Sequence, residues 1–439
     1  MFSVREKQLT WKNWSASVVA TPKKLVTPHH LEELTALVKD CREEGMTIRV
    51  VGAGHSFTPL VATSEVLLSL DKLTGIVEVN EAEQLVTLWG GTRLRDAGPL
   101  LDQFGFAMEN LGDINDQSIA GAISTGTHGT GSQFKSIANQ VEAITLLTAS
   151  GELLNINRQE NEAYFEAARL SLGMLGIIVK VTLRVVKSYS LHENSYRLSL
   201  EEGLANLVAL RENNRNFEFF WFPYTKSIQV KILNERPLHF EAHNKKQSFK
   251  NLAIENGLFW LLSEMSRTVP NTARFVSKVS AFGIPNREEE NLSYLQYATP
   301  RLVKFNEMEY SIPQDAMAEA LRDIEGLFKR KRMNVHFPIE CRYVQEDSIW
   351  LSPSYQRNSA YIAVHMYKGM AFSEYFSEVE AIFASYEGRP HWGKMHSLEY
   401  EDLVSLYPKL TDFLQVRQSL DPEGMFLNEY VRKLFHIST

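Results

Sequence analysis

The stretch that decides the fold is Val50-Val-Gly-Ala-Gly-His-Ser-Phe-Thr-Pro-Leu60, in which a short buried strand runs into a glycine loop. A second glycine-rich segment, Ser118-Ile-Ala-Gly-Ala-Ile-Ser-Thr-Gly-Thr-His-Gly-Thr-Gly131, follows later in the chain. Glycine lets a backbone approach a ligand closely and present its N–H groups to an anion. Serine and threonine hydroxyls in the second segment add neutral hydrogen-bond donors. The two segments together predict a cradle for a diphosphate.

Neither loop carries a nucleotide-binding fingerprint. Phe57 stands where GxGxxG would need its third glycine, and no Gly-Lys-Ser/Thr follows either loop. Taken alone, each loop is equally compatible with an ordinary turn.

The first 186 residues mix short strands with helices. Thr27 as N-cap, Pro28 at the first helical position and Gly45 as the stop predict a first helix. Short strands are expected over 47–51, 66–70, 76–79, 85–89, 141–147, 153–156 and 175–186, with helices over 94–104 and 160–170. Because the strands and helices do not alternate strictly, the pattern favours an α+β arrangement.

From residue 187 the pattern changes to longer strands with helices between them. Strands are expected over 217–221, 228–233, 302–312, 334–344 and 361–367, with a helix over 314–329. The polar stretch 239–250 is expected to be a loop, and 257–262 part of a core or subunit-contact helix. We therefore divide the chain into a first domain over 1–186, a mixed sheet-and-helix domain over 187–404, and a C-terminal segment over 405–439.

Composition excludes several classes of function. The chain of 439 residues has 44% hydrophobic and 23% charged residues and a formal net charge of -7, so nucleic acid is not an expected partner. Its one dense basic cluster, 329–332, is expected to be the solvated end of a helix. No stretch approaches the roughly 20 apolar residues of a membrane span. With no secretory pattern at the N-terminus and only two cysteines, a cytoplasmic location is expected. The sequence leaves the oligomeric state open.

Metal chemistry finds little support in the sequence. There is no HExxH and no CxxC, and His391 and His396 are five residues apart, a poor spacing for two ligands on one helix face. We expect no metal site.

Two strand-like runs in the second half place polar residues on one face. Glu340 and Arg342 are two residues apart, as are His365 and Tyr367, and residues two apart in a strand point to the same side. These side chains suit a site for a hydroxylated substrate. The alternative is a solvent-facing strand with a cross-strand ion pair.

The order of the motifs resembles a known superfamily. The glycine loop, the second glycine segment and Leu172-Gly-Met-Leu-Gly-Ile-Ile-Val-Lys-Val-Thr-Leu183 resemble the FAD-binding half of the vanillyl-alcohol oxidase (p-cresol methylhydroxylase type) flavoproteins. Within it, GxGHS is similar to the branch of the sugar-1,4-lactone oxidases and alditol oxidases. The runs FPIECRYV, RPHWGK and DPEGMFLNEYV, which begin at Phe337, Arg389 and Asp421, are similar to the C-terminal half of that branch.

The resemblance implies a fold and a set of cofactor residues. It implies a two-subdomain FAD-binding domain, a cap over the flavin ring and a C-terminal tail that returns to the FAD domain. It also implies that FAD is bonded covalently to His55. The residues that the resemblance places around FAD are Val51, Gly52, Ala53, Gly54, His55, Ser56, Ser118, Gly121, Ser124, Thr125, Gly126, Thr127, His128, Gly129, Gly176 and Ile178.

The resemblance further implies a reaction. Glu340, Arg342, His365 and Lys394 are placed above the flavin, where a CH–OH group of a sugar-derived 1,4-lactone would lose a hydride to the flavin. His365 is the expected base, because an imidazole titrates near neutral pH. Lys394 is the alternative, since a buried lysine can lose its proton. O2 is the expected acceptor, giving H2O2. The alternative substrates are alditols such as xylitol or sorbitol, and a dehydrogenase that reacts poorly with O2 also stays open.

Overall fold

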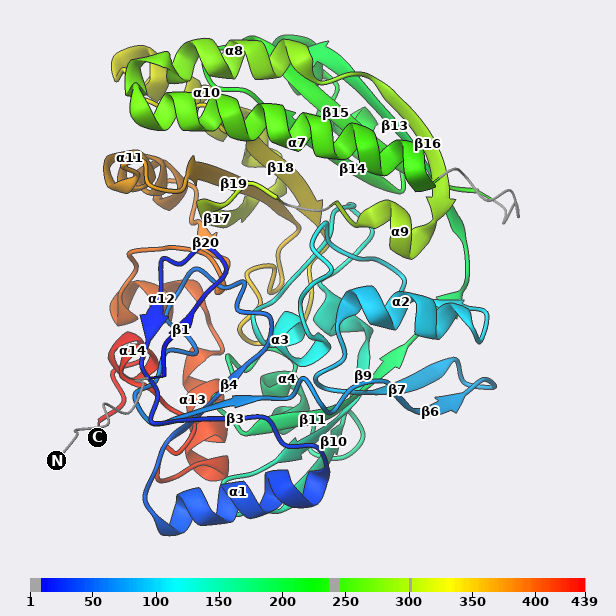
Figure 1. The fold of residues 1–439 in the computed structure, drawn as a ribbon, viewed down its shortest axis with the longest axis vertical. Helices are drawn as coiled ribbons and strands as arrows, with labels where there is room; N and C mark the ends of the chain where they lie inside the picture. The colour runs from blue at the N-terminus through cyan, green and yellow to red at the C-terminus, as the bar shows by residue number, and fades with distance from the viewer. Residues whose placement is uncertain (1–8, 237–244, 300–301, 439) are drawn as a thin grey trace, which may run out of the picture.

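The computed structural model describes residues 9–236, 245–299 and 302–438, and its α+β class confirms the sequence prediction (Figure 1). The lower half of Figure 1 holds two smaller sheets, and the upper half holds a larger antiparallel sheet with its helices. Among the described helices, none is long and apolar enough to cross a membrane.

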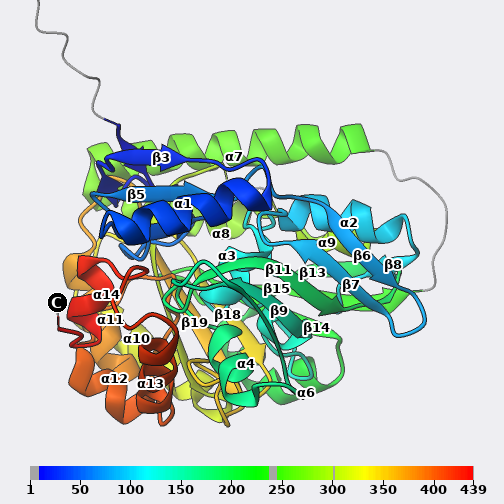
Figure 2. The same ribbon diagram turned by 90° about the horizontal axis from the view of Figure 1, so that it is seen from below.

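The first small sheet contains the glycine loop. It is parallel, in the order β3-β5-β4, with β3 at Lys24–Val26, β5 at Val66–Ser69 and β4 at Ile48–Val51. Helix α1 (Leu31–Glu43) packs on it through Leu34, Val38 and Cys41, which are fully buried. Figure 2 shows α1 beside β3 and β5. A short ladder of β1 (Trp11–Lys12) and β2 (Val19–Ala20) precedes this sheet.

The second small sheet is antiparallel, in the order β10-β9-β11-β7-β6. Its strands are Leu153–Asn157, Val141–Leu147, Ile177–Arg184, Leu85–Trp89 and Ile76–Asn80. Helices α2 (Leu94–Asp102), α3 (Ile119–Ser124) and α4 (Glu162–Ala168) belong to this part, with a 3-10 turn at Ile137–Gln140. The short strands β8 (Phe106–Ala107) and β12 (Val186–Lys187) pair where the chain leaves for the upper half.

The large sheet has eight strands in the order β16-β13-β15-β14-β18-β19-β17-β20. Their bounds are Arg287–Leu292, Ser190–Ser199, Ser227–Arg236, Asn216–Trp221, Ile339–Val344, Ser359–Tyr367, Phe305–Pro313 and Arg389–Pro390. The helices of this half are α5 (Leu200–Ala205), α6 (Leu207–Glu212), α7 (Lys245–Thr268), α8 (Ala273–Gly283), α9 (Ser293–Tyr297), α10 (Met317–Arg330) and α11 (Ser373–Ala384). Short 3-10 turns precede α8, at Pro270–Thr272, and α10, at Gln314–Ala316.

The two faces of the large sheet have different chemistry, because successive side chains of a strand point to opposite faces. One face is apolar: Met308, Cys341, Ile362 and Val364 are buried in the same core as Ile324 of α10. The opposite face is polar over the middle strands and forms the site described below.

The C-terminal helices return to the lower half. Helices α12 (Tyr400–Leu406), α13 (Leu410–Leu420) and α14 (Glu429–Leu434) share a core with the second small sheet, and α13 packs against α4. In Figure 1 they lie beside the N-terminal strands. This return agrees with the tail that the resemblance implies, while the three domain boundaries themselves stay predictions.

Three element predictions were wrong in detail. Helix α1 begins after His30 rather than Thr27, because the His30 ring accepts the Glu33 N–H (3.4 Å) while the Glu33 carboxylate accepts the His29 N–H (2.7 Å). The strand expected from 334 starts only at Ile339, after Pro338, which has no N–H for a ladder. The loop expected over 239–250 is wrong for 245–250, which open α7, while 239–244 lie outside the described residues.

Candidate active site

The glycine loop after β4 lies against the start of α3. A Cβ atom on Gly52 would stand 2.5 Å from the Ser118 hydroxyl oxygen, so only glycine allows this approach. Ser118 is the N-cap of α3, and its side chain accepts the Gly121 N–H (3.3 Å). Gly54 has a φ of +68°, a left-handed conformation that glycine adopts without strain. The loop and the helix start therefore form one unit.

A cavity that we call the loop cavity opens between these two segments. Twelve of the predicted cofactor residues line it: Val51, Gly52, Ala53, Gly54, His55, Ser56, Ser118, Gly121, Ser124, Thr125, Gly176 and Ile178. Sequence reasoning missed other lining residues, among them Trp11, Arg49, Asp71, Gly91, Gln117 and Gly173.

The remaining four predicted cofactor residues lie elsewhere. After α3 the chain turns at Gly126, whose φ is +76°, and leaves the loop cavity. Thr127 and His128 line a second cavity under the large sheet. Gly129 packs against the Leu111 carbonyl, which a Cβ would approach to 2.2 Å. Gly126 and Gly129 are absent from the described lining of both cavities.

His55 lies where the two cavities approach each other. Its ring stacks on Trp14 with centroids 5.6 Å apart, and its Nε2 is 4.0 Å from a carboxylate oxygen of Asp116. Burial lowers the pKa of His55, which keeps the imidazole neutral at physiological pH. A neutral imidazole has a free lone pair and can act as a nucleophile.

The loop that carries His55 is bonded to the segment that carries Lys394. The Phe57 N–H donates to the Gly393 carbonyl (2.7 Å), and the Thr58 hydroxyl donates to the Trp392 carbonyl (3.0 Å). These two bonds hold the glycine loop and Lys394 in one fixed arrangement.

The second cavity, which we call the sheet cavity, lies under the polar face of the large sheet. In the ladder, Glu307 of β17 stands opposite His365 of β19, and Glu340 of β18 stands opposite Ala363. Glu309 is on the other side of Ala363. The sheet cavity is lined by Gly112, Asp113, Ile114, Gln117, Thr127, His128, Phe305, Glu307, Glu309, Glu340, Arg342, His365, His391 and Lys394. All four predicted catalytic residues are in this set, and Gln117 lines both cavities.

Glu307 joins two of the predicted catalytic residues. Its carboxylate forms an ion pair with Lys394 and lies 3.5 Å from Nε2 of His365. Although burial alone raises the pKa of Glu307, Lys394 and His365 lower it well below its usual range. Glu307 is therefore a buried, ionised carboxylate that is paired with Lys394.

The orientation of His365 is fixed by a single contact. Its Nδ1 lies 3.0 Å from the Pro338 carbonyl oxygen, which can only accept, so Nδ1 carries a proton. The other ring nitrogen, Nε2, faces the sheet cavity, 3.5 Å from Glu307 and 4.0 Å from Glu340. A proton taken up at Nε2 would be stabilised by two carboxylates.

Arg342 reaches across the sheet to Glu309. The guanidinium donates to Glu309 and lies 3.4 Å from Glu340, so it serves two carboxylates. Burial alone raises the pKa of Glu309, but Arg342 and His128 lower it to about 2. Both carboxylates and the guanidinium are buried.

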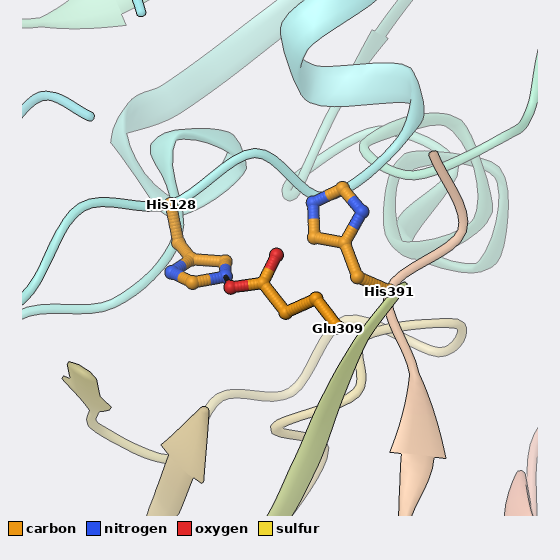
Figure 3. Close-up of side chains that lie close together, drawn as sticks. All are labelled: His128, Glu309 and His391. Atoms are coloured by element: carbon orange, nitrogen blue, oxygen red, sulfur yellow. Dashed lines mark ion pairs between the residues drawn. The ribbon is translucent and has the colours of Figure 1, made fainter. Parts of the chain in front are cut away.

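His128, from the lower half, and His391, which directly follows β20 of the large sheet, approach the same carboxylate, and Figure 3 shows all three side chains converging. His128 Nε2 is 3.6 Å from Glu309, and burial lowers the pKa of His128 to about 3. Burial also lowers the pKa of His391 to about 4. His391 Nδ1 accepts the Gly393 N–H (3.0 Å), whereas His128 Nε2 is buried and makes no hydrogen bond among the described residues. His391 thus meets His128 and Glu309, a grouping that spacing along the sequence could not show.

A second charged group adjoins the sheet cavity. Lys231 lies 2.8 Å from Glu218 and 3.4 Å from Asp113. Burial and Asp113 raise the pKa of Glu218 to about 7, because one ammonium group serves two carboxylates. In the ladder, Glu218 stands opposite both Lys231 and Arg342, so charged residues continue across the polar face.

Sequence reasoning missed Glu307, Glu309 and His391. The two glutamates have the same two-residue spacing as Glu340 and Arg342, in a run expected to be a strand. That spacing could have predicted that Glu307 and Glu309 share the polar face of a strand. Their pairing with Lys394 and Arg342 depends on strand order, which no local pattern reveals.

The residues around the loop cavity fit an FAD. The closeness of Gly52 to Ser118 leaves a bare backbone facing the cavity, as a diphosphate requires. Ser118, Ser124 and Thr125 add hydroxyls, and Gln117 connects this cavity to the sheet cavity, where a redox-active ring would meet its substrate.

Comparisons with known proteins agree with this arrangement. Residues 22–157 match the FAD binding domain, and residues 181–434 match the family described as D-arabinono-1,4-lactone oxidase. The chain is 37% identical to the L-gulono-1,4-lactone dehydrogenase of Mycobacterium tuberculosis, over 97% of this chain and 98% of that protein. It is 31% identical to the L-gulonolactone oxidase of Mus musculus, over 98% and 99%.

The fold has a counterpart among solved structures. The crystal structure of cholesterol oxidase from B. sterolicum superposes with a TM-score of 0.82 at 17% identity, covering 98% of this chain and 97% of that one. An identity this low shows a shared fold only. The family match covers more than half of the chain and the relatives span nearly all of it, so the chain is an FAD-dependent oxidoreductase that belongs to the D-arabinono-1,4-lactone oxidase family.

Proposed function

We propose that the protein oxidises a CH–OH group of an aldono-1,4-lactone of the gulono-, galactono- or arabinono- type to a carbonyl. The observation that carries the proposal is the orientation of His365, whose Nδ1 is held by the Pro338 carbonyl and whose Nε2 faces the sheet cavity between Glu307 and Glu340. The names of the two relatives described above, an L-gulono-1,4-lactone dehydrogenase and an L-gulonolactone oxidase, supply the substrate class.

His365 is the base in this proposal, and Lys394 is not. Lys394 is held in an ion pair with the buried Glu307 carboxylate. His365 takes the hydroxyl proton at Nε2, and Glu307 and Glu340 stabilise the imidazolium that results. Arg342 and Lys394 supply fixed positive charge for the alkoxide that develops as the proton leaves.

Bound FAD would supply the two-electron acceptor for the hydride from the carbinol carbon. The loop at 51–56 and the start of α3 would hold its diphosphate, and Gln117 would lie near its ring. We further propose O2 as an acceptor of the electrons, giving H2O2.

The substrate is tested by anaerobic mixing of the holoenzyme with a panel of aldono-1,4-lactones and alditols, with flavin absorbance as the readout. Bleaching by a lactone and not by xylitol or sorbitol is the expected result. Bleaching by alditols alone would replace the lactone with the alternative substrate class, and bleaching by neither would reject the proposal. A pulse of air after bleaching tests O2: prompt recovery of absorbance with one H2O2 per flavin is expected.

We also propose that His55 forms the covalent bond to the 8α-methyl carbon of FAD. Its neutral imidazole and its place between the two cavities support this. Acid-precipitated protein should remain yellow, and its intact mass should exceed the chain mass by one FAD. His55→Ala should release its flavin on denaturation. Wild-type protein that turns colourless on precipitation would exclude the bond.

A further inference from the structure

A third cavity, which we call the phenylalanine cavity, lies between the outer strands of the large sheet and the helices α7 and α8. Figure 1 shows these two helices side by side over that part of the sheet. The cavity measures about 380 Å³ and is lined by the rings of Phe220, Phe222, Phe259, Phe305 and Phe337. Since an apolar cavity of about 150 Å³ holds a benzene molecule, this one has room for a larger ring system.

The phenylalanine cavity adjoins the sheet cavity. Asp113, Phe305, Glu340 and His365 line both of them, so the two spaces share part of their walls. A molecule in the phenylalanine cavity would lie next to the catalytic groups. Apolar side chains supply most of its wall, and charged residues line the rest, among them Glu193, Lys231 and Arg287.

Two polar atoms of the lining have no partner. Gln229 of β15 is only 6% exposed, yet within the described chain its Nε2 makes no hydrogen bond. The hydroxyl of Ser280 on α8 is also buried and without a partner among the described residues. Buried donors are nearly always satisfied in folded proteins, so two unsatisfied donors on one cavity point to a ligand with acceptor atoms. One donor is on the sheet and the other on the helix that covers it.

We propose that the phenylalanine cavity binds a quinone, a flat apolar ring with carbonyl oxygens at opposite edges, which accepts electrons from the enzyme in addition to O2. The ring would pack among the phenylalanines, and Gln229 and Ser280 would donate to the carbonyl oxygens. The reaction balances: lactone oxidation releases two electrons and two protons, and the quinone takes up both pairs to become a hydroquinone. The transfer of electrons to the quinone rests on the proposed function, because lactone oxidation supplies the electrons. Binding of the quinone does not depend on the proposed function.

The test begins with binding to the oxidised holoenzyme in the absence of lactone. Equilibrium dialysis with 2-methyl-1,4-naphthoquinone should give one saturable site. An azido derivative should label α7, α8 or β15 after irradiation, as mapped by peptide mass. Linear uptake without saturation, or labelling confined to other elements, would overturn the proposal.

Variants then locate the site. Gln229→Leu and Ser280→Ala each remove one donor and should raise Kd by about 3- to 10-fold. Ser280→Phe should fill the space and raise Kd at least about 10-fold. Lys278→Ala, on the same helix but outside the lining, is the matched control and should bind like the wild type.

The two half-reactions separate this proposal from the proposed function. All four variants should keep the wild-type rate of flavin reduction by lactone, while the first three slow reoxidation by the quinone. If Gln229→Leu instead weakens the lactone half-reaction and leaves quinone binding unchanged, the cavity belongs to the lactone and the quinone proposal is wrong. If no lactone reduces the flavin, the proposed function fails, and the dialysis result still decides whether quinone binds.

Discussion

At the scale of single residues, the orientation of His365 determines which group takes the substrate proton. His365→Asn can keep a donor to the Pro338 carbonyl but removes the ring and its Nε2 atom. Flavin reduction by lactone should slow by about 10²- to 10⁴-fold, the range for loss of a general base. The acid limb of the pH profile of the reduction rate should disappear. Stopped-flow absorbance measures both.

The matched control for that variant is His192→Asn, which changes a histidine at the outer part of the large sheet. His192 contacts Glu288 and lies outside the sheet cavity, so its rate should stay at the wild-type value. An unchanged pH profile in His365→Asn would show that another group takes the proton.

The raised pKa of Glu218 leads to a prediction of how the stability of the fold depends on pH. Its pKa is raised to about 7, above the value of about 4.3 expected in the unfolded chain. Between these two values the folded state binds more protons, so its stability falls as pH rises through this window. Glu218→Gln should remove that fall and be more stable than the wild type at pH 8. Urea midpoints at pH 4.5 and 8 measure the effect.

The control for the Glu218 prediction is Glu374→Gln, which removes an exposed carboxylate paired with Lys331. Its urea midpoints should shift by less than the equivalent of about 0.5 kcal/mol at either pH. A Glu218→Gln variant that keeps the wild-type slope with pH would contradict the proposed protonation.

At the scale of secondary-structure elements, an ion pair joins Arg342 of β18 to Glu309 of β17 and compensates the buried negative charge of Glu309. Arg342→Met leaves the buried Glu309 without its cation and should destabilise the fold by about 3–5 kcal/mol. Arg342→Met with Glu309→Gln should recover much of the stability but none of the activity, since the guanidinium also faces the substrate. Thermal melts and lactone assays of Arg342→Met, Glu309→Gln and the double variant complete the cycle.

The contact between the glycine loop and α3 leads to a second prediction at this scale, about FAD binding. Gly52→Ala places a Cβ 2.5 Å from the Ser118 hydroxyl oxygen and should abolish most FAD incorporation. Ser118→Ala removes that oxygen, at a cost of about 1 kcal/mol for the lost helix cap. The double variant should therefore bind more FAD than Gly52→Ala alone, as measured by the ratio of absorbance at 450 and 280 nm. Equal FAD content in the two would show that the clash is not the cause.

Some of the site residues in these strands could be predicted from the sequence, and others could not. Glu340 and Arg342 were predictable because a strand has a two-residue period and the Glu-x-Arg run stands in one. Glu307 and Glu309 have the same spacing, but nothing local shows that β17 lies beyond β19 in the sheet. Thr27 and Pro28 made a good helix start by propensity, and the contacts of His30 with Glu33 prevailed three residues later.

At the scale of the whole molecule, Arg49 joins segments that are distant in sequence. Its guanidinium donates to the carbonyls of Leu60 (2.8 Å), Leu172 (2.8 Å), Gly173 (3.0 Å) and Phe426. Burial lowers its pKa to about 10, with Asp421 opposing. A single side chain thus joins β4, the turn before β11 and the C-terminal segment.

Arg49→Met should leave these carbonyls unsatisfied and lower stability by at least about 3 kcal/mol. FAD content should fall as well, because Arg49 lines the loop cavity. Differential scanning calorimetry and flavin absorbance measure the two effects. Arg184→Met, which removes an exposed pair with Glu142, is the control and should change the melting temperature little. Similar melting curves for both variants would show that Arg49 does not hold the segments together.

The alternation of polar and apolar residues across the large sheet limits how the gene can change. Each catalytic side chain on β17, β18 or β19 is flanked along its strand by a core residue, as Glu307 and Glu309 are by Met308. An in-frame insertion or deletion of one codon within these strands would exchange the two faces beyond it, exposing the core and burying charge against α10. Lineages with new substrates should therefore differ in these strands by substitution alone, and gaps between their sequences should fall in the connecting loops.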